Sequence, residues 1–449
     1  MTCAKKTPRF RGLFFSVLAF PALCSSASAL ANVHECALSL TAGQAPITGQ
    51  LQQAIDHCST RGGGTVTLPA GVWVSGPLML KSHVTLHLAA GSRLTSTGNP
   101  ADFNAAFISK PLQPREALII ATHVRDVAIT GPGTVDGQGQ HAWWPVATDA
   151  RNHLKRGDTR WFASHWKGVP AANGMPRPWL IEFDHVRGGK LRDVQVINSP
   201  MWNVVFRDSQ NIVMSHSSVT NPPDSPNTDG VDVVSSQNVL LRDLRLSTGD
   251  DDISIKSGLA TTGKAPASRD ITIEDCEIDN GHGISVGSET ANGIGRITVR
   301  NIRFRGTENG IRVKSGRDRG SEIGPLSADN IVMTGVRVPL VITDSYGGNG
   351  GYSHQSLSAI SPEPVSRYTP FIHDISVNHL QASGAGMAGM ISGLPEAPLS
   401  NISLKNITIS SVSGMQSRYA NGTLHNVKIT SDQHPLSLQQ GPGSHWRKS

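Results

Sequence analysis

Hydrophobic and polar residues alternate in short runs along most of the chain, from residue 61 to about residue 432. Alternation with a period of two is typical of half-buried β-strands. Many of these runs share one phrase, an Asp or Asn followed by alternating apolar positions, and in the later part of the chain it returns about every 25 to 30 residues. The phrases begin at Asp126, Asp193, Asn211, Asn238, Asp270, Asn330, Asp374, Asn401 and Asn426.

The spacing of the phrase distinguishes two all-β architectures. A β-sandwich joins antiparallel neighbours and would show turn signals about every 8 to 12 residues. One phrase per about 25 to 30 residues instead suits a coil of several short strands that stacks on the next coil. We therefore predict an all-β fold, a single-stranded right-handed parallel β-helix, over residues 61–432.

One segment before the strands has the pattern of an amphipathic helix. Its apolar positions follow the i, i+3, i+4, i+7 rule between residues 48 and 58. We predict that residues 32–60 form an N-terminal segment with a short capping helix, which covers the strand edge that the first coil would otherwise expose. No other segment gives a convincing helical pattern. The apolar positions are Leu51, Ala54, Ile55 and Cys58.

The two ends of the chain differ from the repetitive middle. Four basic residues, an apolar stretch over residues 13–23 and small residues up to Ala31 have the order of a secretory signal peptide. We expect cleavage after Ala31, hence a signal peptide over residues 1–31 and an extracellular protein. A membrane anchor is the competing interpretation, but the stretch is too short to span. Residues 433–449 are predicted to be a disordered tail.

Composition narrows the classes further. Charged residues make up 16% of the chain and there are 46 Gly and 27 Pro, which excludes a coiled coil or helical bundle. Without residues 1–31, 36 basic residues face 34 acidic ones, so the net charge falls from +6 to +2 and predicts neither nucleic acid nor membrane as a partner. Cys36 and Cys58 could pair, Cys276 is expected as a buried thiol, and no CxxC pair favours zinc.

Four polar motifs recur at about one coil length. Asp250 lies 21 residues after Asp229, His282 lies 31 after Asp251, and Arg312 lies 30 after His282. Residues one coil apart in a β-helix lie above one another at about 4.8 Å, so all four motifs should share one face. Stacked carboxylates repel one another and raise one another's pKa, which indicates a functional site. The motifs are Asn227-Thr228-Asp229, Gly249-Asp250-Asp251-Asp252, Gly281-His282-Gly283 and Arg312-Val313-Lys314.

This set of side chains fits one kind of chemistry. Two carboxylates with room for a water molecule between them hydrolyse glycosidic bonds with inversion. Arg312 and Lys314 alternate outward on a strand and would bind the carboxylate of an acidic sugar. We also expect the crowded acids to keep Asp250 protonated above the ordinary Asp pKa of about 3.9, with His282 protonated beside it.

The ordered motifs N-T-D, G-D-D, G-H-G and R-x-K resemble the polygalacturonases of glycoside hydrolase family 28, from about residue 62 to residue 411. The resemblance implies a β-helical catalytic domain, inverting hydrolysis of α-1,4-galacturonan and no metal or other cofactor. Asp252 stands where many relatives have Cys or Asn, which puts the charge of the cluster in question. Val313 replaces the usual Ile.

The resemblance also implies a role for each matching residue. Asp250 would be the general acid, and Asp229 and Asp251 would activate water. His282 would support the acid, and Asn227 would orient the first carboxylate. Arg312, Lys314 and Tyr346, the last within Thr343-Asp344-Ser345-Tyr346, would bind galacturonate.

Several alternatives stay open at this point. We expect a secreted, monomeric enzyme with an endo mode of attack on pectate, but exo attack or a rhamnogalacturonan or xylogalacturonan substrate would use the same motifs. A pectate lyase would share fold and substrate and would need calcium and a basic catalyst. A non-catalytic β-helix adhesin would bind glycan without turnover.

Overall fold

The computed structural model describes residues 34–40, 45–108, 110–169, 174–259, 263–346, 357–432 and 438–448. These belong to one compact unit, His34–Ser449. The predicted signal peptide lies outside the described residues. Among the residues described, no helix is both long and apolar enough to cross a membrane.

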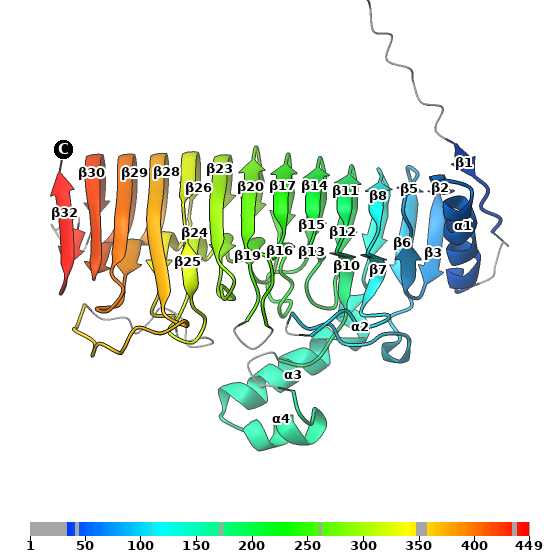
Figure 1. Ribbon diagram of the computed structural model, residues 1–449, viewed down its shortest axis with the longest axis horizontal. Coiled ribbons are helices and arrows are strands. Elements are labelled where there is room, and N and C mark those ends of the chain that lie inside the picture. The colour runs from blue at the N-terminus through cyan, green and yellow to red at the C-terminus, as the bar shows by residue number, and fades with distance from the viewer. Residues whose placement is uncertain are drawn as a thin grey trace, which may run out of the picture. The chain divides into compact units, whose positions relative to one another are not determined.

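The strands form coils in which every strand pairs in parallel with a strand of the next coil. Figure 1 shows the strands side by side in chain order. The fold is therefore a right-handed parallel β-helix, as predicted. Its first face consists of β4 (Leu78–Leu80), β7 (Ala117–Thr122), β10 (Trp179–Asp184), β13 (Val204–Arg207), β16 (Val231–Val234), β19 (Ile253–Lys256), β22 (Ile284–Val286), β24 (Asn309–Lys314) and β27 (Val338–Thr343).

Two further faces complete each coil. The second face consists of β1 (Glu35–Cys36), β2 (Gly64–Leu68), β5 (Val84–Leu88), β8 (Arg125–Thr130), β11 (Arg187–Arg192), β14 (Gln210–Ser215), β17 (Gln237–Arg242), β20 (Ser268–Glu274), β23 (Ile294–Arg305) and β26 (Leu326–Thr334). The third consists of β3 (Gly71–Ser75), β6 (Ser92–Ser96), β9 (Thr134–Asp136), β12 (Gln195–Ile197), β15 (Ser218–Thr220), β18 (Arg245–Ser247) and β21 (Glu277–Asp279). The last coils use β25 (Ser321–Ile323), β28 (Pro370–Ser392), β29 (Leu399–Arg418) and β30 (Ala420–Ser431).

The Asp and Asn residues of the recurring phrase turn the chain near the corners of the coils. All nine have a left-handed backbone conformation, with φ between 51° and 60°. Asn and Asp adopt this conformation more readily than other residues with a side chain. Their amides also stack: Nδ2 of Asn238 donates to Oδ1 of Asn211 at 2.5 Å, and Asn426 donates to Asn406 at 2.8 Å. The phrase therefore marks corners.

Between the faces lies a core of stacked aliphatic side chains. On the first face one inward position is occupied in successive coils by the same type of residue, and each is at most 2% exposed. Each coil therefore buries its apolar residues only against its neighbours. This leaves the outward positions of the first face free for polar groups. The stacked residues are Val204, Val231, Ile253, Ile284, Ile311 and Leu340.

The predicted capping helix is α1 (Thr48–Thr60), which lies at the β2 end of the coils in Figure 1. Its four predicted apolar positions are buried in the same core as the first strands. A disulfide joins Cys36 to Cys58, so the possible pairing is present, and Cys276 is a buried free thiol as expected.

The structure corrects the expectation of a single helix. Three more helices lie between β9 and β10: α2 (Gly139–Ala142), α3 (Trp144–Lys155) and α4 (Thr159–His165). A short 3-10 helix, η1, spans Pro100–Asp102. On α3 only two alanines are buried, Ala147 and Ala150. So small a buried face leaves almost no periodic hydrophobic signal in the sequence.

The prediction of a disordered tail is wrong for residues 438–448. β31 (Leu438–Gln440) pairs with β29, and β32 (Ser444–Lys448) pairs with β30. Leu438 and Trp446 pack against the core. These strands satisfy backbone groups of the preceding coil, which would otherwise form an open sheet edge. The β-helix thus continues past residue 432.

Candidate active site

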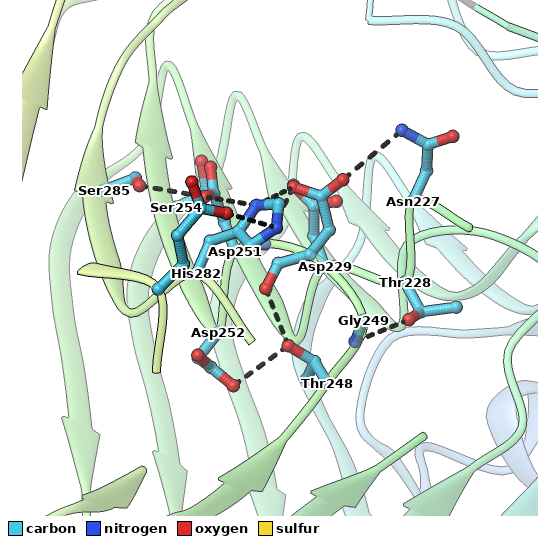
Figure 2. Close-up of polar contacts among 12 residues, drawn as sticks. Asn227, Thr228, Asp229, Thr248, Gly249, Asp251, Asp252, Ser254, His282 and Ser285 are labelled. Carbon is cyan, nitrogen blue, oxygen red and sulfur yellow. Dashed lines mark hydrogen bonds and ion pairs between the residues drawn. The ribbon is translucent and has the colours of Figure 1, made fainter. Parts of the chain in front are cut away.

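The four polar motifs lie together on the first face. Asp229 precedes β16, the three consecutive acids precede β19, His282 precedes β22, and Arg312 and Lys314 are on β24. The parallel register places Asp232, Ser254, Ser285 and Arg312 at the same outward position in four successive coils. Side chains from residues far apart in sequence therefore meet in one cluster, part of which is drawn in Figure 2.

Asp251 is the anionic centre of this cluster. Its Oδ1 accepts hydrogen bonds from the Arg312 guanidinium and from Ser285 Oγ, the latter at 2.9 Å. Its Oδ2 accepts from Lys314 Nζ at 2.9 Å. Burial would raise the pKa of this carboxyl, but the charges of Arg312 and Lys314 outweigh burial and hold the pKa far below its ordinary value. Asp251 is thus ionised.

Arg312 and Lys314 differ from expectation in their surroundings. They were expected to face outward for a sugar carboxylate, yet they are only 4% and 6% exposed. Both are engaged with Asp251 in the structure. Their side chains point away from the core, as the alternation predicted, but other groups of the site bury them.

The pKa of Asp229 is shifted in the opposite direction from that of Asp251. Burial, opposed by Lys256 and reinforced by repulsion from Asp232, raises its pKa well above the ordinary value. Lys256 Nζ lies 3.2 Å from Oδ2 of Asp229 and 2.5 Å from Oδ1 of Asp232. Burial also raises the pKa of Asp232, to about 7. One ammonium group therefore serves two buried carboxyls.

Asp250 contradicts the expectation of a raised pKa. Its Oδ1 lies 3.0 Å from Nδ1 of His282. Burial raises the pKa of Asp250, but the charge and hydrogen bond of His282 prevail and lower it to about 2. In turn Asp250 raises the pKa of His282 against the opposing effect of burial. In the free protein the proton therefore resides on His282, as expected for that residue, and not on Asp250.

Asn227 contacts a different carboxyl from the one expected. Its Nδ2 donates to Oδ2 of Asp250 at 3.5 Å rather than to Asp229. Nη2 of the buried Arg177 donates to Oδ1 of Asn227 at 2.9 Å and so fixes the orientation of the amide. Burial, with repulsion from Arg151, lowers the pKa of Arg177 to about 9.

Asp252 is a buried acid whose two carboxyl oxygens both accept hydrogen bonds. Its Oδ1 accepts from Thr248 Oγ1 at 2.9 Å (Figure 2). Its Oδ2 accepts from the backbone N–H of Gly283 at 2.9 Å. Burial raises the pKa of Asp252 well above the ordinary value and so disfavours its charged form. Gly281 is required beside it, because a Cβ there would lie 2.5 Å from Oδ2 of Asp252.

Tyr346 lies next to the cations of the site. Lys314 Nζ is 5.5 Å from the centre of its ring, and the Arg319 guanidinium carbon is 5.6 Å away. The tyrosine follows β27, one coil beyond β24. The structure thus brings all eight residues that the sequence singled out onto one face, where we place the candidate active site.

Several residues of the site carried no signal in the motifs. Lys256 ends the buried strand β19, and a charged residue in such a strand is a signal that the sequence does offer. Asp232 follows the N-T-D motif by three residues and looked like an ordinary alternating position. Arg177 precedes β10, two coils before Asn227, and only the coil register relates the two residues.

Two groups of side chains are close enough to hold a metal ion, among the residues that the structure describes. One is Asp250, Asp251 and His282, where Arg312 and Lys314 already supply cationic charge to Asp251. The other is His123, Asp184 and His185, at a corner of the coils. There the two imidazole rings stack at 4.5 Å with planes 26° apart, so their in-plane lone pairs do not converge on one point. Neither geometry favours a metal.

Comparisons with known proteins identify the family of this chain. Residues 58–430 match the model of the glycosyl hydrolases family 28. An endo-polygalacturonase of Pectobacterium parmentieri is 32% identical over 345 residues, which is 74% of this chain and 80% of that protein. An exopolygalacturonase of Platanus acerifolia is 26% identical over 81% of this chain and 87% of that protein.

A solved structure shows the same fold. A polygalacturonase from Erwinia carotovora ssp. carotovora is 27% identical, with a TM-score of 0.67 over 89% of this chain and 95% of that one. The chain belongs to glycosyl hydrolases family 28. It is a pectin-degrading glycoside hydrolase of the polygalacturonase type.

Proposed function

We propose that the protein hydrolyses α-1,4-galacturonosidic bonds of polygalacturonate with inversion of the anomeric carbon. The observation that carries the proposal is the cluster on the first face. There Arg312 and Lys314 hold an ionised Asp251. The same cluster contains Asp229, a carboxyl with a raised pKa, and the Asp250–His282 ion pair. This set supplies a proton donor, a proton acceptor and cations for an acidic sugar.

Each group has one role in this reaction. Asp250 donates a proton to the glycosidic oxygen as the bond to the anomeric carbon breaks. A water molecule attacks that carbon from the opposite side and gives its proton to the pair of Asp229 and Asp251. Arg312 and Lys314 favour the charged form of Asp251, which is therefore the acceptor, whereas the raised pKa of Asp229 disfavours its charged form. Arg312, Lys314 and Tyr346 bind galacturonate carboxylates, and Asn227 orients Asp250.

Substrate binding itself prepares Asp250 as the acid. In the free protein its side chain is 21% exposed and its pKa is lowered by His282 and, more weakly, by Lys314. A bound galacturonate would exclude water and would place a negative charge beside Lys314. Both changes raise the pKa of Asp250 and move the proton of the pair from His282 toward Asp250.

Attack within the polymer is the mode we propose. The support is the endo-polygalacturonase relative at 32% identity, against an exopolygalacturonase at 26%. Product sizing from polygalacturonate over time distinguishes the two modes. A ladder of oligomers supports endo attack, whereas monomer or dimer alone contradicts it. Rates on rhamnogalacturonan and xylogalacturonan measured beside it test the choice of substrate.

The experiment that tests the reaction is proton NMR of the first product formed. Inversion of an α-linkage releases the β-anomer first, and mutarotation follows. Initial α-anomer, or an unsaturated product that absorbs ultraviolet light, would contradict the proposal.

We also propose that the protein is secreted after cleavage following Ala31 and acts as a monomer. The Cys36–Cys58 disulfide supports an oxidising compartment. Edman sequencing of secreted protein tests the cleavage site, and sedimentation equilibrium tests the oligomeric state.

A further inference from the structure

Charged side chains alternate in sign along one line of the first face. His282 Nδ1 lies 3.0 Å from Asp250 Oδ1, and His282 Nε2 lies 3.2 Å from Glu308 Oε2. Arg337 follows, 3.9 Å from the other oxygen of Glu308. Acid, base, acid and base therefore come from four successive coils.

Backbone hydrogen bonds fix this order. The N–H of His282 donates to the carbonyl of Asp250 at 2.7 Å, and the N–H of Glu308 donates to that of Gly281 at 2.8 Å. The N–H of Val338 donates to the carbonyl of Glu308 at 3.0 Å. The coil register, rather than side-chain flexibility, thus places a carboxylate on each side of the imidazole.

The contacts at both ring nitrogens determine which form of His282 fits. A neutral imidazole donates from one nitrogen only and would direct its other lone pair at a carboxylate oxygen. A doubly protonated ring donates to Asp250 and Glu308 together. Three other titratable or charged groups act on the ring. Asp251, 3.8 Å from Nδ1, and Asp252 favour the cation when they are ionised, and Arg312 opposes it.

We propose that Glu308 is a positioning residue for the reaction, which holds the His282 ring in the orientation and protonated form that Asp250 requires. The inference rests on the proposed function, in which Asp250 is the acid. Glu308 acts through His282. Its side chain is 36% exposed, so its influence on His282 is screened in part by solvent.

The test separates Glu308 from the reaction itself. Side-chain imidazole resonances of the full-length protein are followed by NMR as a function of pH, with His282→Gln to identify the signal. In Glu308→Gln we expect the titration midpoint of His282 to fall by about half a pH unit or more, because an opposite charge near 3 Å is lost. Glu277→Gln is the matched control, since Glu277 is a half-exposed acid paired with Arg245 on the third face. An unmoved midpoint in Glu308→Gln would overturn the proposal.

Kinetics on polygalacturonate give the second measurement. We expect kcat of Glu308→Gln to fall about threefold or more with little change in KM, and the alkaline limb of kcat to shift to lower pH. Glu308→Asp keeps the charge and should restore part of the kcat that Glu308→Gln loses on the alkaline side of the pH profile. A lower KM with unchanged kcat would instead mean that Glu308 only repels substrate. If the wild-type protein releases no sugar, the proposed function fails, while the NMR titration still decides the role of Glu308.

Discussion

Two ladders of stacked polar side chains run along this β-helix, and they differ in how each side chain pairs with the one in the next coil. At the corners, an Asn amide donates to the Asn carbonyl one coil earlier, as Asn238 does to Asn211. On the first face, charges alternate through Asp250, His282 and Glu308. An amide carries both a donor and an acceptor, so the same side chain can repeat in successive coils. A charge needs its opposite beside it, so the order on the first face is fixed by sequence.

The difference has an energetic consequence. A corner residue is exposed and shares its function with many equivalent positions. The acids of the first face are less exposed, with Asp250 at 21% and Glu308 at 36%, and each depends on a named partner in a neighbouring coil. Substitutions in the two ladders should therefore have different effects. Those at the corners should lower stability locally, and those on the first face should lower catalytic activity.

The largest effect is expected from the reacting acids. Asp250→Asn and Asp229→Asn should each lower kcat on polygalacturonate at least about 100-fold, because general acid or base assistance is lost. Circular dichroism should show that the fold persists. Asp279→Asn, on the third face, is the control and should keep its activity. Near-normal turnover of folded Asp250→Asn would contradict its role as the acid.

Removal of a cation should have a smaller effect on the same face. In Lys314→Ala, Asp251 loses one of its hydrogen bonds and substrate loses a counter-charge, so we expect KM to rise and kcat to fall, with kcat/KM reduced about 10- to 100-fold. Lys190→Ala removes the same charge from an exposed position on the second face and serves as the control. Equal rates on fully methyl-esterified pectin and free galacturonan would count against a role for these cations in binding.

Asp252 offers a test in which chemistry and stability separate. Its folded pKa is raised, so its contribution to stability is full below the unfolded pKa of about 3.9 and is lost as pH rises. Asn at this position needs no proton. We therefore expect Asp252→Asn to match the wild type at pH 4 and to exceed it by about 1.4 kcal/mol per pH unit above that, until the wild-type carboxyl ionises in the fold.

Urea unfolding of both proteins at several pH values measures this difference. Thr248→Val, which removes the hydroxyl that contacts Asp252, indicates how far the surrounding hydrogen bonds matter. A stability difference between the wild type and Asp252→Asn that does not change with pH would mean that Asp252 is ionised in the fold.

The smallest effect is expected at a corner. Asn238→Ala must place an ordinary residue at φ 55° and loses the bond to Asn211, so unfolding free energy should fall by about 1–2 kcal/mol with kcat unchanged. Asn238→Gly removes the strain and should recover most of the loss. A similar loss in both variants would assign the stability to the amide ladder rather than to the backbone.

The repetitive parts of the molecule could be predicted from sequence because their signal is repetitive. Each Asp or Asn phrase marks a left-handed corner, and the motif spacings of 21 to 31 residues match single coils. The coil register brings Asp229, Asp250 and His282 together as that spacing indicates.

The remainder depends on contacts that a single repeat does not encode. In the Asp250–His282 pair, the contact between Nδ1 of His282 and Oδ1 of Asp250 decides which residue carries the proton. The crowding of acids alone predicts a raised pKa for Asp250, whereas its pKa is lowered. Lys256 and Glu308 occupy positions that look like ordinary polar outward residues until the register is known. The helices α2 to α4 bury too few apolar side chains to leave a period, and the strands after residue 437 are defined by the edge that they cover.

The stacking of coils that contact only their neighbours also bears on how such a protein can change over evolutionary time. Whole coils can be gained or lost near either end at modest cost, because the aliphatic stack of the core accepts another layer of Val, Ile or Leu. The stretch from Asn227 to Tyr346 has no such freedom, since Asp251 takes its partners from a strand two coils away. The length of the β-helix can therefore change while the reacting centre is inherited as one block.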